Sequence, residues 1–131
     1  MADIPVWFQR NLGLLSPAQQ QALGRGRVAV IGCGGLGGYL VEELVRLGVG
    51  RLHLFDPDSF SPTNINRQLL AVQATLGRSK AEVAADAARR INPHVEAVAA
   101  PERLDTDNTG ALLAGAGLIL DGCDNFATRL A

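Results

Sequence analysis

The stretch Arg27-Val28-Ala29-Val30-Ile31-Gly32-Cys33-Gly34-Gly35-Leu36-Gly37 decides the fold of this 131-residue chain. Its first five residues form a short β-branched run, which is typical of a buried parallel strand. A helix is expected next, from about Leu36 to Leu47, with Gly48 as its C-cap. The N–H groups at such a helix start favour an anion, and glycine lets a phosphate approach the main chain. The sequence therefore predicts a nucleotide-binding loop that includes Gly32, Gly34, Gly35 and Gly37.

Strand and helix patterns alternate on both sides of this loop. An earlier helix is expected from Pro17, with Ser16 as N-cap, Gln19 completing a capping box, and Gly24 and Gly26 ending it. Further strands are expected at residues 52–56, 95–100 and 118–121, and helices at 79–90 and 109–116. In the helix after the glycine loop, Leu40, Leu44 and Leu47 are expected on one face. This order predicts a doubly wound, Rossmann-like parallel α/β sheet with helices on both faces and an N-terminal helical arm.

The predicted organisation is one domain, in which residues 1–26 form the arm and its helix and residues 27–131 form the nucleotide-binding part. A complete doubly wound sheet normally has more strands, so we expect this to be the N-terminal part of a larger, C-terminally truncated domain. The net charge of −1 suggests neither nucleic acid nor an acidic membrane as a partner. No apolar run is long enough to span a bilayer and no leader is evident, so a cytoplasmic location is expected.

A second group of polar residues follows the strand at 52–56. Asp56 ends that strand at a spacing at which a carboxylate accepts ribose hydroxyls. Asn64, Asn66 and Arg67 come next, at the sheet edge where ligands collect, and the guanidinium fork of Arg67 suits phosphate oxygens. Lys80, the single lysine of the chain, adds a compact positive charge. Taken by itself, the asparagine–arginine segment also fits an N-cap cluster with a solvated arginine.

Three more residues are candidates for the same chemistry. Asp124 and Asn125 follow the strand at 118–121, where the Asp124 carboxylate is placed to hold Mg²⁺ together with substrate phosphates, although an Asx turn is also common for such a pair. Arg10 precedes the first strand and fits either a surface arginine or an arginine finger supplied to a neighbouring subunit. Cys33 and Cys123 form no Cys-x-x-Cys pair and are interpreted as small buried residues.

These motifs together resemble a known family. Trp-Phe-Gln-Arg-Asn at 7–11, the glycine loop, Phe-Asp at 55–56, Thr-Asn-Ile-Asn-Arg-Gln at 63–68, Gly-Arg-Ser-Lys at 77–80, Ile-Asn-Pro at 91–93 and Asp-Asn at 124–125 occur in order. The set resembles the adenylation domain of the ubiquitin-activating superfamily, in its bacterial ThiF/MoeB/HesA branch. The arm departs from the family's frequent Arg-Tyr-x-Arg-Gln pattern.

The resemblance implies an ATP-dependent adenylyltransferase that activates the C-terminal carboxylate of a ubiquitin-like sulfur-carrier protein, as in thiamine or molybdopterin biosynthesis. It implies that Gly35 approaches the nucleotide, that Asp56 takes the ribose and that phosphates are contacted by Asn64, Asn66, Arg67 and Lys80. Asp124 would orient Mg²⁺, and Arg10 would act as a finger across a homodimer interface. Zinc, on paired Cys-x-x-Cys motifs, is expected only in a further C-terminal half.

Three alternatives remain open from the sequence. A tRNA-modifying dehydratase of the same superfamily has a similar Asn-Arg-Gln region, although a basic tRNA-binding surface is not evident in the charge balance. An NAD-dependent oxidoreductase would share the glycine loop but has no need of the arginine, lysine and aspartate set. A non-catalytic nucleotide-binding remnant would keep the loop without turnover.

Overall fold

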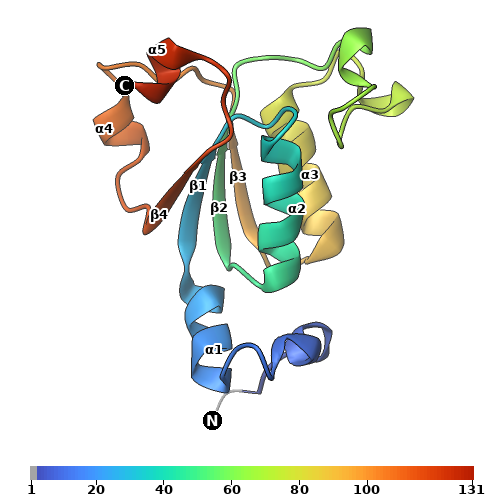
Figure 1. Ribbon diagram of the computed structural model, residues 1–131, viewed down its shortest axis with the longest axis vertical. Helices are drawn as coiled ribbons and strands as arrows, with labels where there is room; N and C mark the ends of the chain where they lie inside the picture. Colours follow the sequence, from blue (N-terminus) through green and yellow to red (C-terminus); the bar gives the residue numbers. More distant parts are fainter. Residues whose placement is uncertain (1–2) are drawn as a thin grey trace.

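A computed structural model describes residues 3–131, which form a four-stranded parallel sheet in the order β3-β2-β1-β4 (Figure 1). The strands are β1 (Arg27–Ile31), β2 (Arg51–Phe55), β3 (Glu96–Ala100) and β4 (Leu118–Asp121). The α-helices are α1 (Pro17–Arg25), α2 (Gly37–Leu47), α3 (Lys80–Ile91), α4 (Thr109–Leu112) and α5 (Phe126–Arg129). Short 3₁₀ turns are η1 (Val6–Asn11), η2 (Pro62–Asn64) and η3 (Gln73–Thr75). In residues 3–131 no helix combines the length and apolar character that a bilayer span demands.

The strand order and direction confirm the predicted doubly wound sheet. Each strand pairs in parallel with its neighbour, so that Ile31 of β1 lies beside Phe55 of β2 on one side and Asp121 of β4 on the other. All carboxyl ends therefore meet at one edge. The chain winds outward from β1 to β2 and β3 and then returns to place β4 on the other side of β1, which is where ligands bind in such sheets.

Helices α2 and α3 cover one face of the sheet (Figure 1). The α2 residues that pack most deeply against the sheet are Val41 and Val45, both at most 1% exposed, whereas Leu47 is 39% exposed. Of the predicted leucine face, Leu40 and Leu44 therefore pack against the core at its border, and Leu47 does not. The reason is that Gly37 starts the helix in contact with the Gly32 carbonyl, which turns the row 37, 41, 45 toward the strands.

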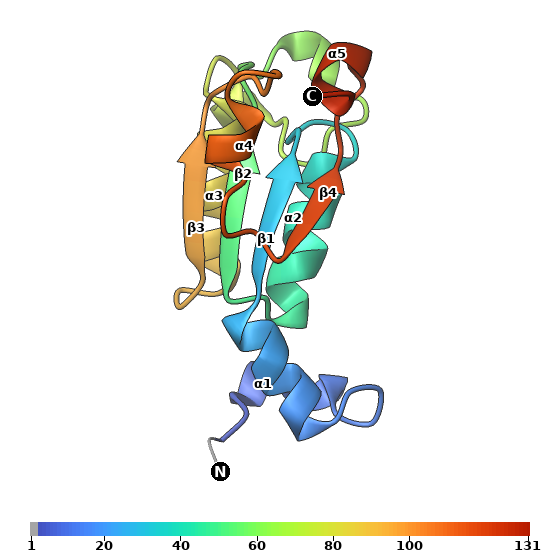
Figure 2. The same ribbon diagram turned by 90° about the vertical axis from the view of Figure 1, so that its left-hand side faces the viewer.

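Within residues 3–131, the opposite face carries only the one-turn helix α4 and its loop (Figure 2). Helices thus flank both faces, as predicted, but unequally. The α4 helix ends at Leu112, short of the predicted Ala116, because Gly115 adopts a left-handed conformation (φ 81°) that ends helical geometry. On this face Val98 and Ile119 stay 42% and 49% exposed.

The N-terminal arm packs on the far end of α2. Ser16 and Gln19 form the predicted capping box of α1, and the helix runs through Gly24 to end at Arg25. The turn η1, which no local pattern predicted, is tied down by tertiary contacts. Asn11 donates its side-chain amide to Gln20 Oε1 at 2.9 Å and to the Leu47 carbonyl at 3.2 Å.

Candidate functional site

A cavity of about 360 Å³ lies at the carboxyl edge of the sheet. The loops that follow all four strands contribute to its wall. Of the predicted site residues, those that line it are Gly32, Gly34, Gly35, Asp56, Arg67, Lys80, Asp124 and Asn125. The sequence prediction that these groups converge on one edge agrees with this placement. Gly37, Asn64, Asn66 and Arg10 are not part of the wall.

The glycine loop forms the floor of the cavity. Gly32 has φ 90°, a conformation that L side chains rarely adopt, and this lets the chain turn from β1 into α2. Leu36, the N-cap of α2, supplies no side-chain acceptor to the first amides of that helix. A Cβ on Gly35 would meet no atom within 4 Å, so this position is open to a ligand. Free N–H groups and an open backbone are the features that bind an anion.

Asp56 fixes the floor to the end of β2. Its Oδ2 accepts the Cys33 N–H at 2.8 Å, and its Oδ1 accepts the Asp58 N–H at 2.8 Å. The carboxylate is 6% exposed and lines the cavity. A carboxylate has about four acceptor sites, so about two remain for hydroxyl donors from a ligand.

Lys80 brings to the cavity a positive charge that forms no ion pair within the described part of the chain. The residue is 8% exposed, and no carboxylate in residues 3–131 forms an ion pair with it. Its Nζ lies 5.6 Å from the centre of the Phe60 ring, and its backbone N–H is bonded to the Asp58 carbonyl. Its Nζ is not among the covered, unpaired atoms of the described chain, so the ammonium is open to the cavity. An anion in the cavity would supply the missing counter-charge.

In the segment from Asn64 to Arg67, one side chain lines the cavity and the two asparagines support the loop that carries it. Arg67 lines the cavity, and its Nη1 donates to Asn66 Oδ1 and to the Thr63 carbonyl, each at 3.0 Å. Asn64 is buried and accepts the Ser61 N–H at 2.9 Å, which holds the turn η2 together. In this arrangement Asn66 orients Arg67, and Asn64 shapes the loop that carries it.

The loop after β4 presents a carboxylate to the cavity. Asp124 is exposed and carries no hydrogen bond within the described chain, whereas Asn125 accepts the Thr128 N–H and caps α5. Arg129 holds this loop through Asp121 Oδ2 at 2.6 Å and the Cys123 carbonyl. No group of three or more metal-ligating side chains occurs in residues 3–131. A divalent cation here would have to share Asp124 with ligand oxygens.

Arg10 lies far from the cavity in its own chain. It is exposed in η1, next to Asn11, whose side chain contacts the C-terminal end of α2. The glycine loop is at the other end of that helix, about 16 Å away by the rise of its 11 residues. Arg10 therefore does not contribute to the cavity of its own chain.

Neither cysteine has the character of a nucleophile. Burial first, and the nearby Asp56 charge second, raise the pKa of the Cys33 thiol far above its usual range. Burial and a hydrogen bond to Asp121 likewise raise the pKa of Cys123. Reactivity requires the thiolate, which these shifts disfavour.

Sequence reasoning missed five polar side chains of the cavity wall, namely Asp58, Gln68, Glu102, Arg103 and Thr128. Arg103 belongs to the loop after β3, and the rule that strand ends meet at one edge would have pointed to that loop. Gln68 lies within the predicted segment but has no charge to mark it.

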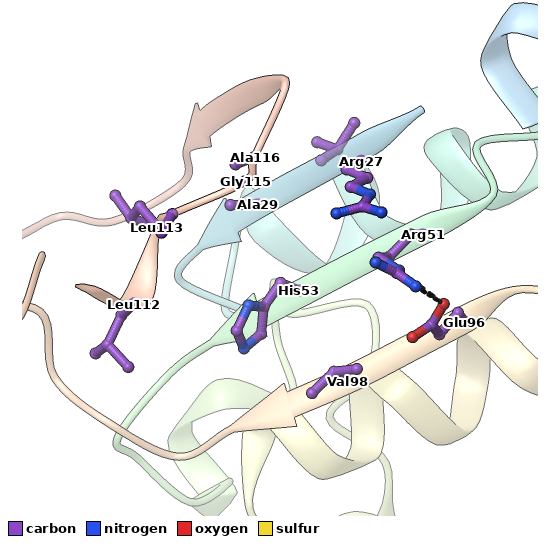
Figure 3. A pocket seen from close by; sticks show the side chains of 12 residues that line it. Arg27, Ala29, Arg51, His53, Glu96, Val98, Leu112, Leu113, Gly115 and Ala116 are labelled. Atoms are coloured by element: carbon purple, nitrogen blue, oxygen red, sulfur yellow. Dashed lines mark hydrogen bonds and ion pairs between the residues drawn. The ribbon is translucent and has the colours of Figure 1, made fainter. Parts of the chain in front are cut away.

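A second hollow, of about 190 Å³, lies on the less covered face of the sheet (Figure 3). His53, Val98 and Leu113 are part of its wall, and Arg51 pairs with Glu96 at 2.5 Å beside it. None of the predicted site residues lines it, and it has no glycine loop or helix start to receive a phosphate. The predicted site residues that line a cavity are therefore at the carboxyl edge of the sheet and not in this hollow.

Comparison with known proteins agrees with this architecture. The ThiF family model matches residues 8–131. A molybdopterin-synthase adenylyltransferase of Salmonella typhimurium is 46% identical over 110 residues, which are 84% of this chain and 44% of that protein. A tRNA threonylcarbamoyladenosine dehydratase of Haemophilus influenzae is 36% identical over 133 residues, covering 98% of this chain and 51% of that protein.

Among solved structures, the E. coli tRNA N6-threonylcarbamoyladenosine dehydratase in complex with ATP superposes with a TM-score of 0.92 at 28% identity. That match covers 98% of this chain and 55% of the solved chain. The chain thus spans about half the length of the relatives it matches. With the family model matching residues 8–131 and the glycine loop, Lys80 and Asp124 gathered at one sheet edge, this chain belongs to the ThiF family.

Proposed function

We propose that this chain is the ATP-binding part of an adenylyltransferase that activates the C-terminal carboxylate of a ubiquitin-like sulfur-carrier protein. The observation that carries the proposal is Lys80, which forms no ion pair within residues 3–131 and lines a cavity floored by open glycine amides. A polyphosphate meets both needs at once, because it supplies negative charge and hydrogen-bond acceptors.

The relatives support the adenylation chemistry. The Salmonella protein is named an adenylyltransferase, and the E. coli structure was solved with ATP. A sulfur carrier protein adenylyltransferase of Thermus thermophilus is 37% identical over 121 residues. This chain covers 45% of that protein, so the carrier itself belongs to the proposal.

The reaction needs little from the protein beyond position and charge. An ionised carboxylate oxygen attacks the α-phosphorus of ATP, the bond from that phosphorus to the bridging oxygen breaks, and pyrophosphate leaves. The carboxylate is already deprotonated near neutral pH, so no general base is required. Lys80, Arg67 and the loop amides stabilise the charge that develops on the phosphate oxygens, while Asp56 holds the ribose. The acyl-adenylate is the product.

Mg²⁺ fits the donor set around Asp124. This ion binds through one or two carboxylates together with substrate phosphates and water. Asp124 supplies one exposed carboxylate on the cavity wall and is free of other bonds in the described chain. The ion would neutralise charge on the polyphosphate when bound.

Arg10 is assigned to the site of a second copy. Its own cavity is at the opposite end of α2, which supports the proposal that Arg10 reaches the cavity of a partner chain. The arm around it exposes apolar side chains, with Val6 68%, Trp7 54% and Leu14 93% exposed, which fits an arm that packs on another subunit. A homodimer with shared sites follows from this assignment.

The test is pyrophosphate exchange into ATP in the presence of a ubiquitin-like carrier. We expect Arg67→Ala and Asp124→Ala to reduce exchange at least about a hundredfold, since each removes charge stabilisation from the transition state. Arg90→Ala, an exposed arginine of α3 away from the cavity, is the matched control. Exchange by both site variants at the control rate would remove Arg67 and Asp124 from the mechanism.

A second candidate is a tRNA-modifying dehydratase that adenylates a carboxylate on a modified base. The superposition on the E. coli dehydratase, with a TM-score of 0.92 over 98% of this chain, favours it. Exchange stimulated by tRNA carrying that base, and not by a carrier protein, would select this candidate.

A further inference from the structure

Gln68 is held against the glycine loop by its own backbone. Its N–H donates to the Asn64 carbonyl at 2.9 Å, and its carbonyl accepts the Ala71 N–H at 3.0 Å. A Cβ built on Gly34 would lie 3.4 Å from Cδ, Oε1 and Nε2 of Gln68 alike. The side-chain amide therefore lies flat over Gly34, where it forms part of the cavity wall.

This amide is unpaired in the described chain. The residue is 7% exposed, and Oε1 is covered and accepts no hydrogen bond. Nε2 has no partner in residues 3–131 either, but unlike Oε1 it is not a covered atom. Its N–H groups therefore face the cavity.

Gln20 shows what a structural glutamine does in the same fold. It is 3% exposed, and both ends of its amide are bonded, with Oε1 accepting from Asn11 and Nε2 donating to the Leu47 carbonyl at 2.9 Å. Buried polar groups are nearly always satisfied in this way, because an unpaired one destabilises the fold. Gln68 departs from that rule at the place where a ligand would bind.

We propose that Gln68 is a further ligand-positioning residue, whose Nε2 donates a hydrogen bond to the phosphate held over Gly34 and Gly35. The inference rests on the proposed nucleotide-binding function and adds to it a neutral, directional donor beside the charges of Arg67 and Lys80. An uncharged amide fixes the orientation of a phosphate oxygen in a way that a mobile ammonium cannot. In this orientation of the side-chain amide, Oε1 is buried without a hydrogen-bond partner, which destabilises the ligand-free fold.

The experiment compares Gln68→Met with the unmodified 131-residue chain by calorimetric titration with ATP and by thermal unfolding without ligand. Methionine is similar in size and shape to glutamine but lacks the amide oxygen and the amide nitrogen. We expect ATP affinity to fall about tenfold, as for a lost hydrogen bond to a charged group, while the unfolding midpoint stays or rises. Gln73→Met, an exposed glutamine of η3, should keep its affinity, and Gln20→Met should lower the midpoint.

Unchanged ATP affinity in Gln68→Met would overturn the inference, and so would a loss of affinity accompanied by a lower midpoint, which would assign Gln68 to structural support. Gln68→Glu provides an independent readout. Its carboxylate should repel phosphate at pH 8 and recover affinity, relative to the unmodified chain, as it is protonated toward pH 5. Failure of the unmodified chain to bind ATP would instead refute the proposed function.

Discussion

Two glycines of one loop, Gly35 and Gly37, are required for different reasons. A Cβ at Gly35 would meet nothing within 4 Å, so the fold has room for a side chain there. A Cβ at Gly37 would overlap the carbonyl of Gly32, because helix and loop touch at that point. The first glycine is therefore available to a ligand, and the second is required by packing.

This difference predicts opposite effects of the same substitution. Gly37→Ala should lower the free energy of unfolding by about 3 kcal/mol or more, since backbone must move to relieve the overlap. The free energy of unfolding of Gly35→Ala should lie within about 1 kcal/mol of that of the unmodified chain. This variant should nevertheless bind ATP more weakly, because its methyl group would occupy space beside the phosphate. Urea denaturation and ATP titration of both variants check this. Equal stability of the two variants would contradict the packing argument.

At the scale of single residues, the sequence predictions that agree with the structure came mostly from charged residues and recognised motifs. Asp56, Lys80 and Asp124 line the cavity as expected, since each follows a strand end or opens the next helix. Asn64 does not, because its side chain closes a turn that local spacing does not reveal. Gln68 was missed because its distinguishing feature is a covered side-chain oxygen without a hydrogen-bond partner, which is visible only in the folded structure.

At the scale of elements, the sheet was predictable and the short helices were less so. The glycine-bounded strand β1 has the predicted limits, whereas β2 begins and ends one residue early, so that Asp56 follows the strand instead of ending it. Hydrophobic runs specify strands well, whereas η1 depends on contacts of Asn11 with distant residues. The rotation of α2 about its axis likewise follows from one tertiary contact, that of Gly37 with the Gly32 carbonyl. The spacing of hydrophobic residues along the helix does not reveal this contact.

The less covered face of the sheet carries a pH-sensitive group, His53 of β2. Its ring lies 4.2 Å from the Phe55 ring, and burial lowers its pKa below the usual 6.5, against the opposing effect of Glu102. The unfolded chain then takes up a proton more readily than the folded one. The stability contributed by neutral His53 is thus present above about pH 6.5 and is lost as pH falls below it.

The prediction is a decline in the free energy of unfolding between pH 7.5 and pH 5 that is smaller in His53→Phe. Urea denaturation at both pH values measures it. His94→Gln, which keeps His53, should retain the full decline. An identical decline in the unmodified chain and in His53→Phe would show that other groups cause it.

At the scale of the whole molecule, the arm and the cavity lie at opposite ends of α2, and the proposed site is complete only between two chains. Mixing Arg10→Ala chains with Lys80→Ala chains should therefore restore part of the exchange activity that neither has alone, because each mixed dimer contains one site with both residues. Pyrophosphate exchange on the mixture, with mixed dimers verified by mass, is the measurement. Mixed dimers without recovery would contradict a finger acting between subunits.

The central claim is that an anion bound in the cavity is the ion-pair partner that Lys80 lacks within residues 3–131. Titration of the unmodified chain and of Lys80→Met with ATP tests this claim most directly. Removing the ammonium should weaken ATP binding at least about tenfold, because a charged donor to the phosphates is lost. The unfolding midpoint should not fall, because Lys80 forms no ion pair within residues 3–131. Arg90→Met, on the exposed side of α3, should bind as the unmodified chain does. The account predicts this loss of ATP affinity and weaker binding of NAD than of ATP by the unmodified chain. Equal ATP affinity with and without Lys80, or tighter binding of NAD, would contradict it.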